Sequence, residues 1–333
     1  MKILDNIKKN TILLLGITLL VLYIVLKDDF EDIIAAFSHI DIRYIIAAFI
    51  FFFLSIVIKS YVNYIIVNDK KKISFLESLK HSLIIQFFNG VTPFATGGQP
   101  MEVYMLKEHN ISLAKATNQT IQSFIFYQIA LVICGFLAVA CNYFLHLFPK
   151  VTLLQHFVLL GFIINIGVAV FLIMISYSKK TTNQVCKFFK WIFKKLKINK
   201  TDKEIEEKFT DFHNGFQEMK KRKGLFTVGV LLNIASLLCL YIVPLFILYS
   251  MSNSYSMNVY ETLTASAYVY VMGSFVPIPG ASGGIEYGFT QFFGNFIGLN
   301  MIGAVLIIWR TITYYFGMII GAILFNFEKK VKE

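Results

Sequence analysis

The sequence is poor in charged residues. Lys, Arg, Asp and Glu make up 15% of its 333 residues, against about 25% in a soluble domain. Hydrophobic residues make up 56%, and the mean hydropathy is +0.65. With apolar runs that approach membrane-spanning length, this composition excludes an ordinary soluble protein and fits only a polytopic membrane protein.

Cysteine is scarce, and the four that are present show no C-x-x-C spacing, which argues against a disulfide framework or a metal site. The sequence also lacks H-E-x-x-H, a Walker A motif, and G-x-G-x-x-G after a strand. The six histidines are scattered and suggest no chemical role. We therefore expect no cofactor and no metal.

Long apolar runs are abundant, and six of them predict full membrane spans. The first could be read as a signal peptide, but it is long for an apolar signal core and no A-x-A cleavage pattern follows it. We therefore expect it to be retained. The six expected spans are residues 11–26, 42–67, 120–144, 156–177, 225–250 and 299–327.

Basic loops mark the cytoplasmic side of a membrane protein. The segment 176–224 has fourteen Lys or Arg and six Asp or Glu, so it carries 14 − 6 = +8 of the net charge of +11. The N-terminal lysines, residues 69–72 and the lysine-rich tail fall on the same side of a six-span path, so we expect both termini in the cytoplasm. The lysines and aromatic residues of 176–224 also suit an amphipathic helix on the anionic inner leaflet. The positive-inside rule accounts for this basic segment, and we expect no nucleic-acid partner.

Two further apolar regions, 75–107 and 260–296, are each broken by nearly the same six residues. "PFATGG" occupies 93–98 and "PGASGG" occupies 279–284, so the motifs lie 279 − 93 = 186 residues apart. The pieces on either side of each break are short for a crossing, which favours two re-entrant hairpins.

The spacing of these motifs predicts an internal repeat. The first half, 1–148, and the second, 149–333, would each hold three full spans and one hairpin. Three is an odd number, so the second half would enter the membrane upside down relative to the first, as in many transporters. The expected fold is an all-α polytopic membrane protein with six spans, two re-entrant helical hairpins and an inverted repeat.

A proline and two glycines leave backbone groups without helical partners, which is tolerated at membrane depth only inside protein or beside a wet cavity. We expect a half-helix to begin near each glycine pair, with free N–H groups and its positive dipole end towards an anionic headgroup. Thr96 and Ser282 would cap these helices or donate to the ligand. The expected substrate-binding residues at the breaks are Pro93, Thr96, Gly97, Gly98, Pro279, Ser282, Gly283 and Gly284.

Charged residues inside membrane segments are costly and indicate function by default. Glu102 and Glu286 would carry a coupling proton, contact a cationic headgroup or pair with an internal base. Lys59 and Arg310 are the available bases, although Lys59 could instead reach the cytoplasmic interface. The weaker candidates Gln86, Asn89 and Gln99 could cap freed backbone groups.

The stretches "NGVTPFATGGQPMEVYMLKEHNIS" and "FVPIPGASGGIEYGF" resemble the flippase-like family formed by the transmembrane region of lysylphosphatidylglycerol synthase. The resemblance covers nearly the whole chain. Its elements are P-x-x-x-G-G-x-x-x-E, ending at Glu102, and P-x-P-G-x-x-G-x-x-E, ending at Glu286.

The resemblance implies translocation of membrane lipids, anionic or aminoacylated, in a bacterial plasma membrane, and links the chain to resistance against cationic peptides. The alternative is phosphatidylglycerol lysyltransferase activity, or a membrane subunit that works with a separate synthase protein. No soluble stretch is long enough for an aminoacyl-transfer domain, since 176–224 has about fifty residues, so we do not expect this chain alone to be an enzyme. A third alternative is a scaffold that moves nothing. The lipid-transport hypothesis predicts that Glu102→Gln and Glu286→Gln stop transport without loss of folding.

Overall fold

The computed structural model describes residues 40–67, 73–149, 151–195, 201–251 and 257–332, and every regular element in these ranges is helical. Five helical stretches are long and apolar enough to cross a membrane, and they correspond to five of the six expected spans. The expected span 11–26 lies outside the described residues. The five are Ile42–Val67, Leu113–Leu145, Leu154–Ser176, Gly224–Met251 and Met301–Phe327.

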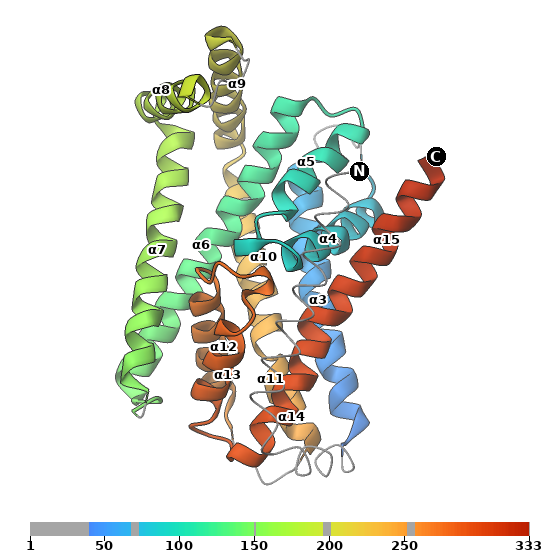
Figure 1. Cartoon of the computed structure of the whole chain (residues 1–333), viewed down its shortest axis with the longest axis vertical. Coiled ribbons are helices and arrows are strands. Elements are labelled where there is room, and N and C mark those ends of the chain that lie inside the picture. Colours follow the sequence, from blue (N-terminus) through green and yellow to red (C-terminus); the bar gives the residue numbers. More distant parts are fainter. Residues whose placement is uncertain (1–39, 68–72, 150, 196–200, 252–256, 333) are drawn as a thin grey trace.

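The long helices run side by side along the length of the molecule (Figure 1). Helix α10 packs against both α3 and α6, and α7 packs against α6. The outward side of α7 exposes large apolar side chains such as Ile163 and Phe171, as expected of a surface that faces lipid rather than water. These helices are α3 (Ile42–Val67), α6 (Leu113–Leu145), α7 (Thr152–Tyr177), α10 (Lys223–Tyr241), α11 (Val243–Met251), α14 (Leu299–Arg310) and α15 (Gly317–Lys332).

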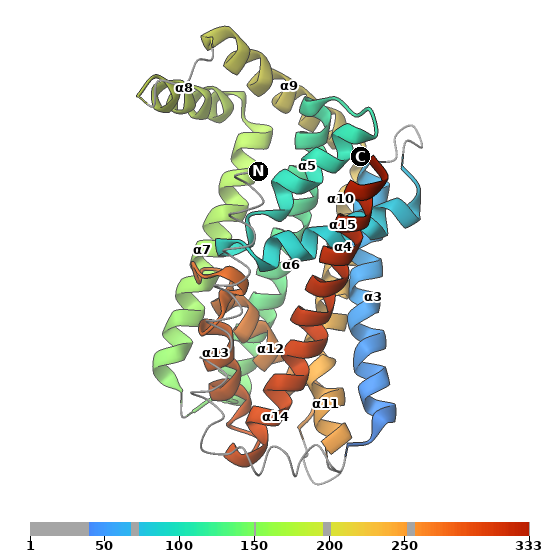
Figure 2. The same cartoon turned by 45° about the vertical axis from the view of Figure 1, so that its right-hand side comes forward.

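Two short helix pairs lie among the long helices, and each is joined by one 3-10 turn. The first consists of α4 (Phe75–Gly90), η1 (Pro93–Ala95) and α5 (Gly98–Glu108), and the second of α12 (Val259–Gly273), η2 (Pro279–Ala281) and α13 (Gly284–Phe293). The first lies towards one end of the molecule and the second towards the other, and η1 contacts η2 between them (Figures 1 and 2). The breaks therefore lie where the sequence predicts them. Re-entry into a membrane and the inverted repeat stay predictions.

The two helix pairs start in the same way. At the start of α4, the backbone N–H of Ser74 donates to Glu77 at 2.7 Å. At the start of α12, the backbone N–H of Asn258 donates to Glu261, also at 2.7 Å. A glutamate at the third helical position that accepts from the capping residue satisfies a backbone donor that would otherwise lack a partner. These starts are 258 − 74 = 184 residues apart, close to the spacing of the glycine motifs.

Helix α15 packs closely on α4 through two small residues. A Cβ on Gly321 would lie 2.2 Å from the backbone oxygen of Leu83, and one on Gly317 would lie 2.1 Å from Oε1 of Gln86. Glycines four residues apart let two membrane helices approach to backbone contact. This packing holds the last long helix against the first helix pair.

Helices α8 (Lys179–Lys195) and α9 (Asp202–Lys221) form the basic segment at one end of the molecule. In both views α8 lies across the end of α7 rather than along it (Figures 1 and 2). Phe188 and Trp191 stack on each other and are exposed. An exposed aromatic pair on a lysine-rich helix is typical of a helix that lies in a membrane interface.

Candidate functional site

The turns η1 and η2 share an unusual backbone conformation. Phe94 and Ala95 have φ of 54° and 52°, and Gly280 and Ala281 have φ of 64° and 51°. Left-handed backbone is unfavourable for residues with a Cβ. It occurs at equivalent residues of the two turns, 186 positions apart. The backbone then differs, because Gly97 has a φ of −75° and Gly283 a φ of 85°. Gly280 also has a steric reason, because a Cβ there would lie 2.1 Å from the hydroxyl of Tyr314.

The half-helices begin at Gly98 and Gly284, as the sequence predicts, but three N–H groups at or just before these starts are already bonded. The N–H of Gly97 donates to Thr92 Oγ1 at 2.8 Å, and that of Gly98 to Asn89 Oδ1 at 2.9 Å. The expectation of free N–H groups for an anionic headgroup is therefore wrong at both residues. Asn89 does cap freed backbone, as expected.

The N–H group just before the start of α13 is also bonded. The N–H of Gly283 donates to Oε2 of Glu286 at 2.6 Å, so the expectation of a free donor is wrong there too. Capping by hydroxyls also differs from the expectation. The hydroxyl of Thr96 donates back to the carbonyl of Pro93 at 2.9 Å, and the N-cap of α13 is Gly283 rather than Ser282. Pro93 and Pro279 are the first residues of η1 and η2. Beside η2, Ser282 is buried and Gly284 packs against the side chain of Val276.

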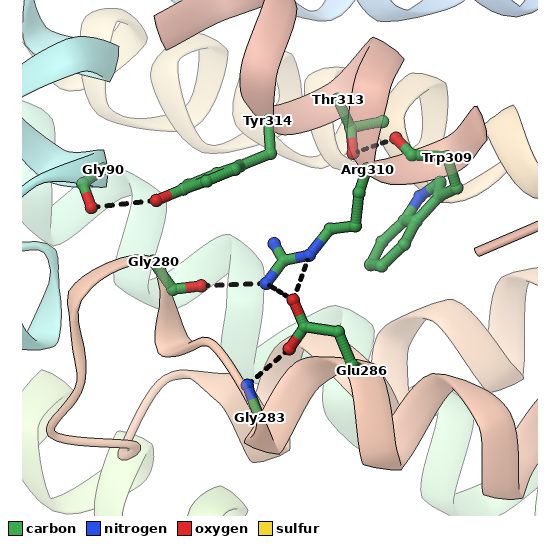
Figure 3. A network of polar contacts seen from close by, with 8 residues as sticks. All are labelled: Gly90, Gly280, Gly283, Glu286, Trp309, Arg310, Thr313 and Tyr314. Carbon is green, nitrogen blue, oxygen red and sulfur yellow. Dashed lines mark hydrogen bonds and ion pairs between the residues drawn. The ribbon is translucent and has the colours of Figure 1, made fainter. Parts of the chain in front are cut away.

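A buried ion pair fixes the second tip. Arg310 donates from Nε and Nη2 to Oε1 of Glu286 at 2.7 and 2.5 Å, and from Nη2 to the carbonyl of Gly280 at 3.1 Å (Figure 3). The side chains of Arg310 and Glu286 are 5% and 1% exposed. Buried charges need a partner and further hydrogen bonds, and this pair has both. The arrangement joins α13, η2 and the end of α14.

A π-helical turn follows Arg310 directly. It covers Thr311–Phe316 and separates α14 from α15 within one apolar stretch. The guanidinium of Arg310 lies 4.8 Å over the ring of Tyr314, and the Tyr314 hydroxyl donates to the carbonyl of Gly90 at 2.9 Å (Figure 3). Single π turns are frequent at functional sites. This one links Arg310 and the second tip to the first helix pair.

Glu102 and Lys59 are arranged differently from Glu286 and Arg310. Both line a cavity of about 430 Å³ beside the first tip. Glu102 is buried and Lys59 half-buried, yet no ion pair within 4 Å joins them. The ammonium of Lys59 instead lies 5.3 Å over the ring of Tyr127. The two opposite charges thus share one cavity without closing on each other.

A second cavity of about 280 Å³ lies beside the second tip. Lys59, Asn89, Phe94, Ala95, Tyr127 and Ser274 line both cavities. The cavities therefore adjoin at η1, with Glu102 in the first and Arg310 in the second. Three of the four predicted charged residues, Lys59, Glu102 and Arg310, line these cavities. The fourth, Glu286, pairs with Arg310.

Sequence reasoning missed most of the polar lining of the larger cavity. Gln128 donates to Asn165 at 2.6 Å, and Asn165 donates to Ser274 at 2.7 Å. Ser123 donates to Asn63 on the opposite helix. Amides and hydroxyls spaced along apolar helices α3, α6 and α7 are the signal that could have revealed them.

The sequence is similar to known membrane proteins. The chain matches the family described as "Lysylphosphatidylglycerol synthase TM region" over residues 11–321. It belongs to this family. Among curated proteins, this member of the lysylphosphatidylglycerol synthase TM-region family is similar to a "UPF0104 membrane protein" from Archaeoglobus fulgidus, with 25% identity over 77% of each chain. It is also similar to an "Uncharacterized protein MG306 homolog" from Mycoplasma pneumoniae, with 24% identity over 73% of this chain and 65% of the relative.

Proposed function

We propose that the protein moves a phospholipid, with an anionic or aminoacylated headgroup, across a bacterial plasma membrane in which both its termini are cytoplasmic. The headgroup would pass through the two adjoining cavities at the contact of η1 and η2. The observation that carries this proposal is the pair of opposite charges, Glu102 and Lys59, that share a polar cavity without forming an ion pair.

Charges held in a membrane protein without closing on each other favour a charged ligand. Each buried charge is costly unless it has a partner, and a zwitterionic or anionic headgroup would supply one. The cavity volume of about 430 Å³ lies within the range of small-molecule sites, about 300–1,000 Å³. Lys59 would bind the phosphate, and Glu102 an amine.

The Arg310–Glu286 pair suits a different role. Its hydrogen bonds to Gly280 and Gly283 hold the second tip in shape, and the π turn connects it to Gly90 through Tyr314. We assign this pair the positioning of the second tip against the first. Glu102 and Lys59 are the residues that would contact the headgroup.

Reconstitution into vesicles tests the proposal. Fluorescent phospholipids with different headgroups are placed in the bilayer, and the fraction that dithionite bleaches from outside reports movement between leaflets. We expect faster movement than in empty vesicles for at least one headgroup, with loss in Glu102→Gln and Lys59→Gln. Glu207→Gln, an exposed glutamate on α9, is the matched control. Equal rates with and without protein for every headgroup would refute the proposal.

Aminoacyl transfer to phosphatidylglycerol stays the alternative. Its support is the word "synthase" in the family description, and no contact in the described residues favours it. Purified protein, phosphatidylglycerol and aminoacylated transfer RNA in one mixture would decide it. Aminoacylated lipid formed without another protein would reverse the ranking.

A further inference from the structure

Two histidines lie next to each other at the outer end of the first helix pair. The ring centroids of His81 and His109 are 5.3 Å apart. His81 is on α4 and only 5% exposed, whereas His109 directly follows α5 and is half-exposed. The chain then enters α6, whose contact with α9 places this end of the molecule beside the basic segment. The pair thus leads from the surface at that end into the protein.

A small cavity lies directly inside His81. Its volume is about 10 Å³, close to the roughly 10–15 Å³ that one water molecule needs. His81 and Glu102 both line it, together with the polar side chains of Asn63, Tyr64 and Ser78. A water there would have several hydrogen-bond partners, including the imidazole and the carboxylate.

The small cavity shares lining residues with the larger cavity beside the first tip, which we call the central cavity. Glu102 and Asn63 line both the small cavity and the cavity of about 430 Å³. Glu102 therefore stands between them, with His81 on one side and Lys59 on the other. The order from the surface inward is His109, His81, the water-sized cavity, Glu102 and the central cavity.

We propose that His109 and His81 form a proton path between the α8–α9 end of the molecule and Glu102. This inference rests on the proposed function, because it names the coupling ion of the same site. Imidazole suits such a path, since it accepts a proton at one ring nitrogen and releases another from the second.

The proton balance of one passage is simple. A proton from the aqueous side binds one nitrogen of His109 and passes to His81. His81 then releases a proton to the water of the small cavity, and that water gives one to an oxygen of Glu102. Both histidines end neutral but in the other tautomer, which a ring rotation or a proton exchange with water resets before the next passage. The water ends as it began, and Glu102 changes from a carboxylate to a neutral carboxylic acid.

Other charged groups lie near the path and affect how readily His81 and Glu102 hold a proton. Glu77 and Lys80 on α4 and Glu108 on α5 act on His81 through space, and Lys59 on α3 acts on Glu102. Burial, His109 and Lys80 oppose a proton on His81, whereas Glu77 and Glu108 favour one, and the balance lowers the pKa of His81. Lys59 favours the ionised form of Glu102, so a proton stays on Glu102 most readily when a bound anion neutralises Lys59.

Protonation of Glu102 changes the charge of the central cavity. Lys59 and an ionised Glu102 sum to zero, whereas Lys59 and a protonated Glu102 sum to +1. An anionic headgroup binds better to the second state. Proton entry from the α8–α9 end would thus load an anionic headgroup, and proton release would free it.

Infrared spectroscopy on the reconstituted protein tests the path without any transport assay. The carbonyl stretch of protonated Glu102 is identified by its loss in Glu102→Gln, and its growth is followed after a rapid drop in pH. Proton transfer by a positioned side chain is typically worth a factor of about 10²–10⁴ in rate, so we expect growth at least about tenfold slower in His81→Gln and His109→Gln. His156→Gln, at an exposed histidine on α7 that lines neither cavity of the path, is the control and should match the unaltered protein.

Each outcome of this test is decisive. If His81→Gln fails to fold, the half-exposed His109→Gln still gives the answer. Equal rates in all variants, or no protonated Glu102 at any pH that the protein tolerates, would overturn the path. If the protein does not accelerate lipid movement in vesicles, the proposed function is refuted. The infrared result then tests the proton path by itself. Lipid movement with the same response to a pH gradient in His109→Gln as in the unaltered protein would overturn the path alone.

Discussion

Arg310 places two guanidinium nitrogens on one carboxylate oxygen of Glu286, at 2.7 and 2.5 Å, inside the protein. Within the described residues, the first helix pair has no equivalent of this contact, because Glu102 and Lys59 share a cavity without pairing. The two glutamates follow similar glycine motifs but have different surroundings. Glu286 is bonded to the second tip, whereas Glu102 lines the larger cavity.

This difference changes the expected effect of Glu286→Gln. The sequence alone predicts loss of transport with folding intact, but the structure shows that the substitution would leave the charge of Arg310 buried and unpaired. Breaking a buried pair in this way costs about 3–5 kcal/mol. We expect a clear fall in the thermal unfolding temperature in detergent, whereas Glu102→Gln should leave that temperature nearly unchanged.

A double-mutant cycle isolates the pair itself. Arg310→Met alone leaves Glu286 buried with its bond to Gly283, and the combination with Glu286→Gln removes both charges. Residues in one salt-bridge network couple by about 0.5–3 kcal/mol. The double variant should therefore be more stable than the sum of the single effects predicts. Strict additivity of the unfolding free energies would contradict the pairing.

Phe94 is a second position where stability and transport should separate. Its φ of 54° is unfavourable for any residue with a Cβ, and its side chain is 54% exposed. Phe94→Ala and Phe94→Gly remove the same ring, but only glycine relieves the left-handed backbone, which costs other residues about 1–2 kcal/mol. We expect Phe94→Gly to be the more stable variant by about 1 kcal/mol.

The outcome for transport should be the same in both Phe94 variants. Phe94 lines both cavities, so removal of the ring changes them equally in each. Lipid movement should fall in both, whichever is more stable. A higher stability of Phe94→Ala than of Phe94→Gly would contradict the left-handed conformation of η1.

Gly280 and Gly167 form a matched pair for the second tip. A Cβ on Gly280 would meet Tyr314 and also requires left-handed backbone, whereas a Cβ on Gly167 would meet nothing within 4 Å. Gly280→Ala should lower the unfolding temperature, while Gly167→Ala in α7 should leave it unchanged or raise it, since alanine is favoured over glycine in a helix by about 1 kcal/mol. Equal shifts in the two variants would argue against the contact of η2 with Tyr314.

Trp191 provides a test of where α8 lies. The chain has only two tryptophans, and Trp309 is 2% exposed inside the protein, whereas Trp191 is 57% exposed. If α8 lies on the membrane, lipids with brominated acyl chains should quench the part of the fluorescence that Trp191→Phe removes. Quenching should increase when anionic lipid is present. A Trp191 signal that no brominated lipid affects would place the helix in water.

The sequence predicted the helices and their breaks because those signals are local. Apolar length defines the spans, and the proline and glycines at 93–98 and 279–284 interrupt the helices at the residues where the structure does. The pairing of Glu286 with Arg310 was also accessible, since a charge inside a membrane protein requires a partner. The sequence offers two candidate bases inside the expected spans, Lys59 and Arg310, as partners for the glutamates.

The features that the sequence did not reveal depend on packing between distant segments. Thr92 accepts the N–H of Gly97, which no propensity indicates, although capping of freed backbone by Asn89 was expected. The π turn after Arg310 leaves no composition signal. His81 reads as an isolated histidine in an apolar run, and only the contact of α4 with α3 and α5 places it beside Glu102.

Blocking the cavities at Ala95 tests the central proposal most directly, because this exposed residue lines both of them. Ala95→Cys is reconstituted, and lipid movement is measured before and after reaction with a bulky charged methanethiosulfonate reagent, and again after reduction. The unaltered protein, with its four native cysteines, is treated in parallel. We expect the reagent to stop movement only in Ala95→Cys and reduction to restore it. Complete modification of the Ala95→Cys variant at the introduced thiol, with no change in the rate of lipid movement, would contradict passage between the tips.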